Sequence, residues 1–416
     1  MLRRHERFDR GRGTLSVGSL VASAAALLPI DMHDIVSLGT AIHGNAICGI
    51  PAGRLLRGGR AGPSRLRPAP FQAPGSENLT TGFTLRKPYL LFIGDAQDEA
   101  EAKTACGLRD WARDACRAQL RLPEAKLDLG LPDMTPDEAA RAGVGSFVIG
   151  VAPVGGQIPR EWESVLHAAI AAGLDIVSGM HRPLEAVPGL AEAARDRGVA
   201  LVNVRLPRQA FPPGSGRRRT GKRLLTVGTD CALGKKYTAL ALTEAMRARG
   251  LAVDFRATGQ TGILIAGGGI ALDAVTADFA AGAAEMLSPD AAPDHWDVIE
   301  GQGSLFHPAY AGVTLALVHG SQPDVLILCH DPTRRHLHAF PDFPTPDLRT
   351  AAARYIEAAR LTNQNAMLGG ISLNTSMLDA TARARVLAET AEYLGVPCFN
   401  PLQTSLKATL DFFLRR

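Results

Sequence analysis

RLLTVGTDCALGKKYTAL, residues 223–240, is the stretch of sequence that decides the fold. An apolar run ends at Gly228, a short loop follows, and a helical pattern begins at Lys235. Glycines let successive backbone N–H groups converge on an anion, and a helix N-terminus and a lysine add positive charge there. We therefore predict a phosphate-binding loop. We expect it to use Gly228, Thr229, Asp230, Cys231, Ala232, Leu233, Gly234, Lys235, Lys236 and Thr238.

This loop departs from the usual nucleotide-hydrolase pattern in two ways. Five residues separate Gly228 from Gly234, where the usual pattern has four. Lys236 also occupies the position of the Ser or Thr whose hydroxyl holds Mg²⁺, and Thr238 comes only two residues later. A second ammonium group at that position repels a divalent cation. The sequence thus predicts phosphate binding without a resident metal.

A second motif, EGQGSLFHPAY (residues 300–310), follows the apolar run Asp297–Glu300. Ligands of open α/β sheets lie outside the carboxyl ends of the strands, so this motif and the phosphate loop should meet in one crevice. Glu300 is a candidate to hold Mg²⁺ or accept a proton, and His307 is a candidate acid or base near neutral pH. A solvated carboxylate and a structural histidine are the alternatives.

A third glycine-rich stretch is TGQTG (residues 258–262), with AGGG at 266–269. The backbone amides of Gly259 to Gly262 are placed to bind a carboxylate or a second phosphate. A plain flexible loop is the competing interpretation. We expect Asp273 and Asp278 in the helix that follows to be solvated.

Short apolar runs alternate with helical stretches from Lys87 onward, which indicates parallel sheets covered on both faces. The predicted fold is α/β, with a Rossmann-like parallel-sheet domain (84–212), a basic Gly/Pro linker (213–222) and a P-loop NTPase-like doubly wound domain (223–416). Residues 1–83 are predicted to be a poorly structured extension, and the apolar run Thr14–Ile30 leaves a targeting role open. The expected strands are Tyr89–Ile93, Ser146–Val151, Asp175–Ser178, Ala200–Val204, Arg223–Gly228, Ala252–Ala257, Asp297–Glu300, Asp324–His330, Gly369–Asn374 and Pro397–Phe399. The expected helices are Glu161–Ala172, Leu184–Arg197, Lys235–Arg249, Ile270–Met286, Leu348–Leu361 and Ala380–Leu394.

Composition excludes several classes of protein. The 416 residues are 46% hydrophobic and 21% charged with a net charge of +4, which argues against global disorder and against a nucleic-acid binder. Six Cys without metal spacing argue against a zinc site or a disulfide framework. No other apolar run approaches the ~20 residues that span a membrane. We expect a cytoplasmic enzyme that forms a homo-oligomer and has neither a nucleic-acid nor a membrane partner.

Beyond these motifs, the chain resembles the D-glutamate N-acetyltransferase family, long known as a P-loop family of unknown function. The resemblance covers roughly Ile93 to the C-terminus and is specific because many motifs coincide. They are GDAQDEAEAKTACGL (94–108), RLP (121–123), DLGLPDM (128–134), IGVAPVGGQIP (149–159), GLDIVSGMH (173–181), GTDCALGKKYTAL (228–240), ATGQTGILIAG (257–267), EGQGSLFHPAYAGVTLALVHG (300–320) and LCHDPTR (328–334).

The resemblance implies acetyl transfer from acetyl-CoA to the amine of D-glutamate, with coenzyme phosphates held by the loop. Glu300, His307 and Asp230 are the candidate catalytic residues. Amides of residues 301–303 or 259–262 are candidates for stabilising the oxyanion. The expected substrate-binding residues are Gly259, Gln260, Thr261, Gly262, Gln302, Ser304, His181 and Arg182, with Arg182 contacting a carboxylate. A covalent step on Cys231 is a less simple route.

The second domain alone also resembles dethiobiotin synthetase, which shares the GTD-x₃-GK and EG-x-G motifs. That resemblance implies an ATP- and Mg²⁺-dependent ligase or kinase, in which the loop Asp and the strand-end Glu serve the metal. A nucleotide-binding regulatory module is a third possibility. Lys236 argues against the ligase, and the two additional motifs argue against a simple switch.

Overall fold

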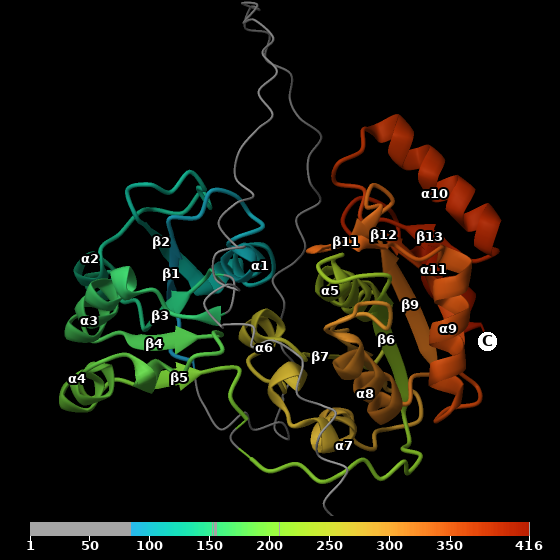
Figure 1. Ribbon diagram of the computed structural model, residues 1–416, viewed down its shortest axis with the longest axis horizontal. Coiled ribbons are helices and arrows are strands. Elements are labelled where there is room, and N and C mark those ends of the chain that lie inside the picture. Colours follow the sequence, from blue (N-terminus) through green and yellow to red (C-terminus); the bar gives the residue numbers. More distant parts are fainter. Residues whose placement is uncertain (1–84, 152, 154–155, 208, 416) are drawn as a thin grey trace, which may run out of the picture. The chain divides into compact units, whose positions relative to one another are not determined.

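A computed structural model describes residues 85–415 apart from 152, 154–155 and 208. Two parallel sheets carry helices on their faces (Figure 1). The predicted α/β class is therefore confirmed. The predicted extension (1–83) lies outside the described residues, and the domain limits at 212 and 222 stay predictions, although the two sheets fall within residues 89–203 and 222–399.

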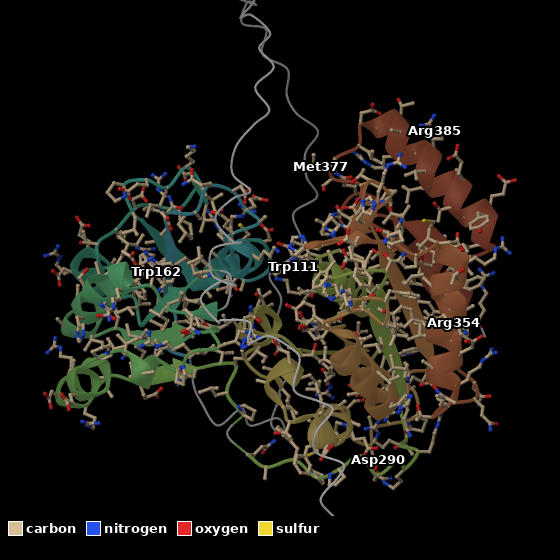
Figure 2. The ribbon with its side chains drawn as sticks, in the orientation of Figure 1. Trp111, Trp162, Asp290, Arg354, Met377 and Arg385 are labelled. Carbon is tan, nitrogen blue, oxygen red and sulfur yellow. The ribbon has the colours of Figure 1, made fainter. Side chains whose placement is uncertain are left out.

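The first sheet has five parallel strands in the order β2-β1-β3-β4-β5. Strand β1 (Tyr89–Gly94) is buried along its whole length, as expected for a strand covered on both faces. Trp162, labelled in Figure 2, packs edge-on against Phe92 of this strand. The other strands are β2 (Cys116–Arg121), β3 (Ser146–Ile149), β4 (Asp175–Ser178) and β5 (Leu201–Asn203), and the helices are α1 (Lys103–Trp111), α2 (Pro136–Arg141), α3 (Glu163–Ala171) and α4 (Leu190–Arg197).

Four of these five strands lie where the apolar runs predicted them, whereas β2 was missed. Its sequence, CRAQLR, carries two arginines and lies at the sheet edge, so it does not read as a buried run. The predicted helix Leu184–Arg197 is wrong in its first half. A 3₁₀ turn (Leu184–Ala186) precedes Pro188 and Gly189, and α4 begins only at Leu190 because Gly189 has a positive φ of 70°.

The second sheet has six parallel strands in the order β13-β12-β9-β6-β8-β7. Successive residues of β6 alternate between two cores, since Leu224 joins one and Leu225 the other. Helices α5 (Lys235–Arg247) and α11 (Lys407–Leu414) cover the first face, and α7 (Ala277–Leu287), α8 (Ala311–Ser321) and α9 (Leu348–Arg360) cover the second. The strands are β6 (Lys222–Gly228), β7 (Val253–Arg256), β8 (Trp296–Ile299), β9 (Val325–His330), β12 (Met367–Leu373) and β13 (Cys398–Phe399).

All six strands confirm predicted runs, and α10 (Ala380–Leu394) has the predicted bounds. The glycine-rich stretch after β7 is not a flexible loop, because residues Gln260–Ala266 form helix α6. The predicted helix Ile270–Met286 is shorter, since α7 begins at Ala277 after a 3₁₀ turn. Helix α8 and a hairpin of β10 (His336–Leu337) and β11 (Phe340–Pro344) were not predicted.

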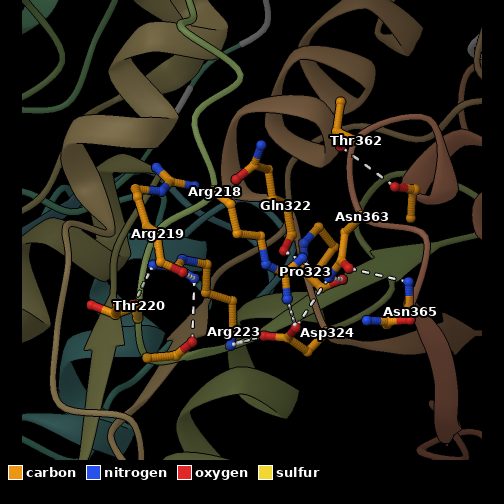
Figure 3. A network of polar contacts seen from close by, with 12 residues as sticks. Arg218, Arg219, Thr220, Arg223, Gln322, Pro323, Asp324, Thr362, Asn363 and Asn365 are labelled. Carbon is orange, nitrogen blue, oxygen red and sulfur yellow. Dashed lines mark hydrogen bonds and ion pairs between the residues drawn. The ribbon is translucent and has the colours of Figure 1, made fainter.

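The segment before β6 is mostly exposed but is fixed by arginines to the amino end of the second sheet (Figure 3). Arg223 is buried: its Nε donates to Oγ of Ser288 at 2.9 Å, and its Nη2 donates to the carbonyl of Thr220 at 2.8 Å. The Ser288 hydroxyl in turn donates to the carboxylate of Asp297 at 2.6 Å. This network stabilises the sheet at the end opposite the phosphate loop.

No helix within residues 85–415, apart from the undescribed positions, combines the length and the apolar character that crossing a bilayer requires.

We expect Arg223→Met to lower the free energy of unfolding by about 3 kcal/mol, because it leaves several buried polar groups without partners. Denaturant unfolding followed by circular dichroism measures this effect. Arg218→Met is the matched control, since Arg218 is half exposed and pairs at the surface with Asp324. It should cost less than about 1 kcal/mol. Equal unfolding midpoints for the two variants would refute a stabilising role for the buried guanidinium.

Candidate active site

A cavity of about 820 Å³ lies at the carboxyl ends of the strands of both sheets. The first sheet's side contributes Lys103, Cys106, His181 and Arg205. The second sheet's side contributes residues 231–237, 259–261 and 300–303 together with Tyr310. Three stretches predicted from separate sequence motifs therefore meet in one place.

Helix α1 closes this cavity by packing against α5 and α6. The hydroxyl oxygens of Thr104 and Thr261 are 3.0 Å apart, and the Tyr237 hydroxyl donates to Asp110 at 2.7 Å. Trp111, labelled in Figure 2, meets the Tyr237 ring edge-on. Helix α1 approaches the other two helices most closely at Gly107. A Cβ at this position would clash with the methyl group of Thr261 on α6 and lie 2.7 Å from Nζ of Lys236 on α5. These contacts fix the width of the cavity.

The phosphate loop contains two left-handed residues before α5 begins: Ala232, with φ 52°, and Gly234, with φ 97°. Nζ of Lys235 donates to the Asp230 carbonyl at 2.8 Å, so the lysine side chain folds back along the loop. Burial lowers the pKa of Lys235. Residues 231–236 of the predicted loop line the cavity.

Asp230, a predicted catalytic residue, holds the loop in place and does not line the cavity. Its carboxylate accepts from Arg334 Nη1 at 2.6 Å, from the His338 amide at 2.7 Å and from the Cys231 amide at 2.6 Å. Two of these donors come from the unpredicted hairpin β10–β11 and the residues just before it. This segment therefore supplies hydrogen-bond partners that a buried carboxylate requires.

Other predicted loop residues also support the backbone from behind. The Gly228 carbonyl accepts from the Tyr355 hydroxyl at 2.7 Å, and the Thr229 hydroxyl is 2.9 Å from Nδ1 of His330. The Thr238 hydroxyl is 2.8 Å from that of Ser372. Thr238 therefore does not compensate for a missing metal ligand at the loop.

Glu300 lines the cavity and is 4% exposed. Its carboxylate accepts from the amides of Thr258 at 3.0 Å and Gly259 at 3.2 Å, just before α6 begins. Burial raises its pKa, and Lys236 opposes that shift. The amide of Gly259, which we expected to bind an anionic ligand, is therefore occupied by a carboxylate of the protein itself. Gln302 beside it lines the cavity and donates to the Thr258 hydroxyl at 3.1 Å.

His307 and Ser304 lie outside the cavity lining. Nδ1 of His307 accepts from the Ala309 amide at 3.2 Å, and its ring stacks on Tyr310 with centroids 4.6 Å apart. The buried Ser304 hydroxyl accepts from the Phe306 amide at 3.2 Å. The motif 300–310 thus contributes Glu300, the turn after it and Tyr310 to the cavity, while His307 supports Tyr310 from beneath.

On the first sheet's side, Arg182 does not line the cavity, because its Nη2 donates to the Ala186 carbonyl at 2.6 Å. His181 does line it, and burial lowers the pKa of its imidazole. The buried arginine of the cavity is Arg205, just after β5, which the sequence analysis missed. It donates to the Gly179 carbonyl at 2.9 Å and to Gln260 at 2.6 Å, and it pairs with Asp273. The sequence signal that could have identified Arg205 is its position just after a strand of the first sheet.

The loop residues do not suit Mg²⁺. Ligand atoms of Asp230, Cys231 and His307 lie within 4.8 Å of one another, but the Asp230 carboxylate is already paired with Arg334. Lys236 stands where a metal-binding hydroxyl would be needed. Burial also raises the pKa of the Cys231 thiol, which disfavours the thiolate that a covalent step requires.

Fold and site together define an α/β enzyme in which residues of a Rossmann-like domain and of a P-loop domain line one cavity. Residues 118–207 match a Rossmann-like domain of unknown function (DUF1611_N), and residues 212–410 match a P-loop domain of unknown function (DUF1611_C). A crystal structure of a DUF1611 family protein from Anabaena variabilis is 33% identical with a TM-score of 0.72, covering 79% of this chain and all of that one.

Two curated relatives give the family its name. A D-glutamate N-acetyltransferase from Tritonibacter scottomollicae is 50% identical over 327 residues, 79% of this chain and 98% of that protein. Another from Pseudoalteromonas sp. is 46% identical over 319 residues, 77% of this chain and 96% of that protein. The chain belongs to the D-glutamate N-acetyltransferase family and is an acyltransferase, as its motifs indicated.

We expect Gly262→Ala to reduce acyl transfer by about a hundredfold, because the new methyl group would overlap the Glu300 carboxylate and displace it. Gly312→Ala is the matched control: Gly312 also lies in a helix at the cavity, and a Cβ there meets no atom within 4 Å. Steady-state rates of both purified variants test this. Equal rates would mean that the position of Glu300 is unimportant.

Proposed function

We propose that the protein transfers the acetyl group of acetyl-CoA to the amine of D-glutamate, with the P-loop binding the coenzyme phosphates. One observation carries the proposal: the loop predicted to bind phosphate lines the same cavity as Arg205 and His181 from the other sheet. A phosphate-bearing donor and an anionic acceptor fit such a cavity. The names of the two relatives supply the reaction and the acceptor.

The donor side of the proposal rests on the loop. CoA carries a pyrophosphate and a 3′-phosphate, which suit backbone amides at a helix N-terminus with Lys235 beside them. Nothing in this role requires a phosphate bond to break. That agrees with Lys236 in place of the metal-binding hydroxyl and with an Asp230 carboxylate already paired with Arg334.

The acceptor side rests on the cations of the opposite wall. Arg205 is held in place by three partners and is buried, so little side-chain entropy remains to be lost on binding a carboxylate. Lys103, at the start of α1, is exposed and lines the same cavity. Two such groups match the two carboxylates of a glutamate.

Acetyl transfer also requires a base for the acceptor's ammonium and donors for the tetrahedral oxyanion. Of the three carboxylate and imidazole groups that the sequence suggested, Glu300 alone lines the cavity. The backbone N–H groups of residues 301–303 adjoin it at the turn after β8 and are the candidates for the oxyanion.

The test is to incubate the protein with acetyl-CoA and D-glutamate and to follow release of the free CoA thiol. We expect thiol release that depends on D-glutamate and continues in EDTA. ATP hydrolysis that EDTA abolishes, without any thiol release, would favour the magnesium-dependent ligase instead. L-Glutamate and D-glutamine as acceptors report on handedness and on the side-chain carboxylate.

We expect Lys235→Ala to raise KM for acetyl-CoA about 10- to 150-fold, equivalent to one charge-assisted phosphate contact of about 1.5–3 kcal/mol. KM for D-glutamate should change far less. Lys407→Ala, at an exposed lysine of α11, is the control. An unchanged KM for acetyl-CoA in Lys235→Ala would remove the phosphate role from this lysine.

A further inference from the structure

We propose that Lys236 is the proton acceptor of the reaction, taking the proton from the acceptor's ammonium group before that amine attacks the acetyl carbon. The inference rests on the proposed function and assigns a step within it. It differs from the sequence prediction, which placed Lys236 among the phosphate-binding residues.

The two adjacent lysines of the loop are used differently. Nζ of Lys235 is bonded to the loop carbonyl of Asp230. The side chain of Lys236 instead leads to helix α1, where its Nζ lies against Gly107, and it lines the cavity. Within the described part of the chain, Nζ of Lys236 has no hydrogen-bond or ion-pair partner and stands 5.3 Å from the Tyr237 ring centroid. The amine of Lys236 therefore lies at the cavity wall without a hydrogen-bond acceptor from the described residues.

The composition of the chain supports a chemical role for an amine here. Only seven of the 45 cationic residues are lysines, yet Lys103, Lys235 and Lys236 all line this one cavity beside a single arginine, Arg205. A guanidinium cannot give up its proton in a protein, whereas an ammonium can. The three lysines that line the cavity are therefore the cationic side chains there that can give up a proton.

The charged and titratable groups around Lys236 come from three elements. Helix α1 presents Lys103, Cys106 and Asp110, the end of β8 presents Glu300, and Lys235 and Tyr237 flank it on α5. Burial lowers the pKa of Lys236 to about 8, although the carboxylates of Glu300 and Asp110 oppose that shift. The neutral amine is thus present above about pH 8, far below the range of a free lysine. Glu300, bonded to two amides, is held beside it.

The proposed step balances. The neutral Lys236 amine takes one proton from the acceptor's ammonium and becomes an ammonium itself. The freed amine forms the N–C bond to the acetyl carbon, and the C–S bond to CoA breaks. The second proton of the attacking nitrogen goes to the CoA thiolate, which leaves as the thiol. Lys236 then returns its proton to water, so each turnover releases one proton.

The test compares the wild type with Lys236→Arg, which keeps the positive charge but cannot act as a base. We expect kcat for D-glutamate acetylation to fall by about 10²–10⁴ while KM for acetyl-CoA is unchanged. In the wild type, kcat should rise with pH and level off above about pH 8, because the neutral form is the active one. This inflection should be absent from the variant. Lys407→Arg is the control for a lysine remote from the cavity.

A second variant keeps Lys236 in the sequence but displaces its amine. In Gly107→Ala the new methyl group would lie 2.7 Å from Nζ of Lys236 and would also clash with the Thr261 methyl group, so kcat should fall. If Lys236→Arg keeps nearly the wild-type kcat, or shows the same pH inflection, Lys236 is not the proton acceptor. The proposed acetyltransferase reaction would still stand. Absence of thiol release by the wild type overturns the proposed function itself, and this assignment with it.

Discussion

Helix α1 meets helices α5 and α6 at Gly107, a position where even a methyl group has no room, and the cavity exists because of this contact. The carboxyl ends of two separate parallel sheets would otherwise form two open crevices. The contact is polar as well as close, since Thr104 meets Thr261 and Asp110 accepts from Tyr237. Such buried hydrogen bonds fix an orientation more than they add stability. The structure uses them to set the distance between the phosphate loop and Arg205.

Two carboxylates that the sequence suggested for catalysis turn out to organise backbone. Asp230 gathers Arg334 and the His338 amide behind the loop, and Glu300 gathers the Thr258 and Gly259 amides before α6. A buried carboxylate needs such partners, because an unpaired one costs several kcal/mol. Once they are bonded in this way, neither is free to move to a substrate. Among the described residues that line the cavity, Nζ of Lys236 has no hydrogen-bond or ion-pair partner.

The sequence predicted the strands well because each is an apolar run long enough for a buried parallel strand, as in β6 and β9. It missed β2, where arginines at a sheet edge hide the pattern. It also took the TGQTG stretch for a loop, since glycines normally weaken a helix. Gly262 is needed there for another reason: the Glu300 carboxylate occupies the space of its side chain.

The site was predictable only where one local motif defines it. The loop 228–235 has a fixed spacing and context, so its residues were found from sequence alone. The arginine that lines the cavity was not, because Arg182 and Arg205 each follow a strand of the first sheet and differ in what surrounds them. Arg182 turns to the Ala186 carbonyl, whereas Arg205 is held by Gln260, which comes from the other sheet's side. No spacing along the chain reports such a pairing.

The charge of the cavity unites these observations. Among the residues that line it, cations outnumber carboxylates: Lys103, Lys235, Lys236 and Arg205 against Glu99, Asp273 and Glu300. Two of the three carboxylates are already paired, Glu99 with Arg109 and Asp273 with Arg205. The uncompensated charge therefore lies on the lysines, of which Lys236 loses its charge above about pH 8. Under the proposed function, an anionic donor and a dicarboxylate acceptor would supply the missing negative charge beside Lys236. A cavity balanced by its own carboxylates would bind such ligands less tightly, because each would first have to displace an internal partner.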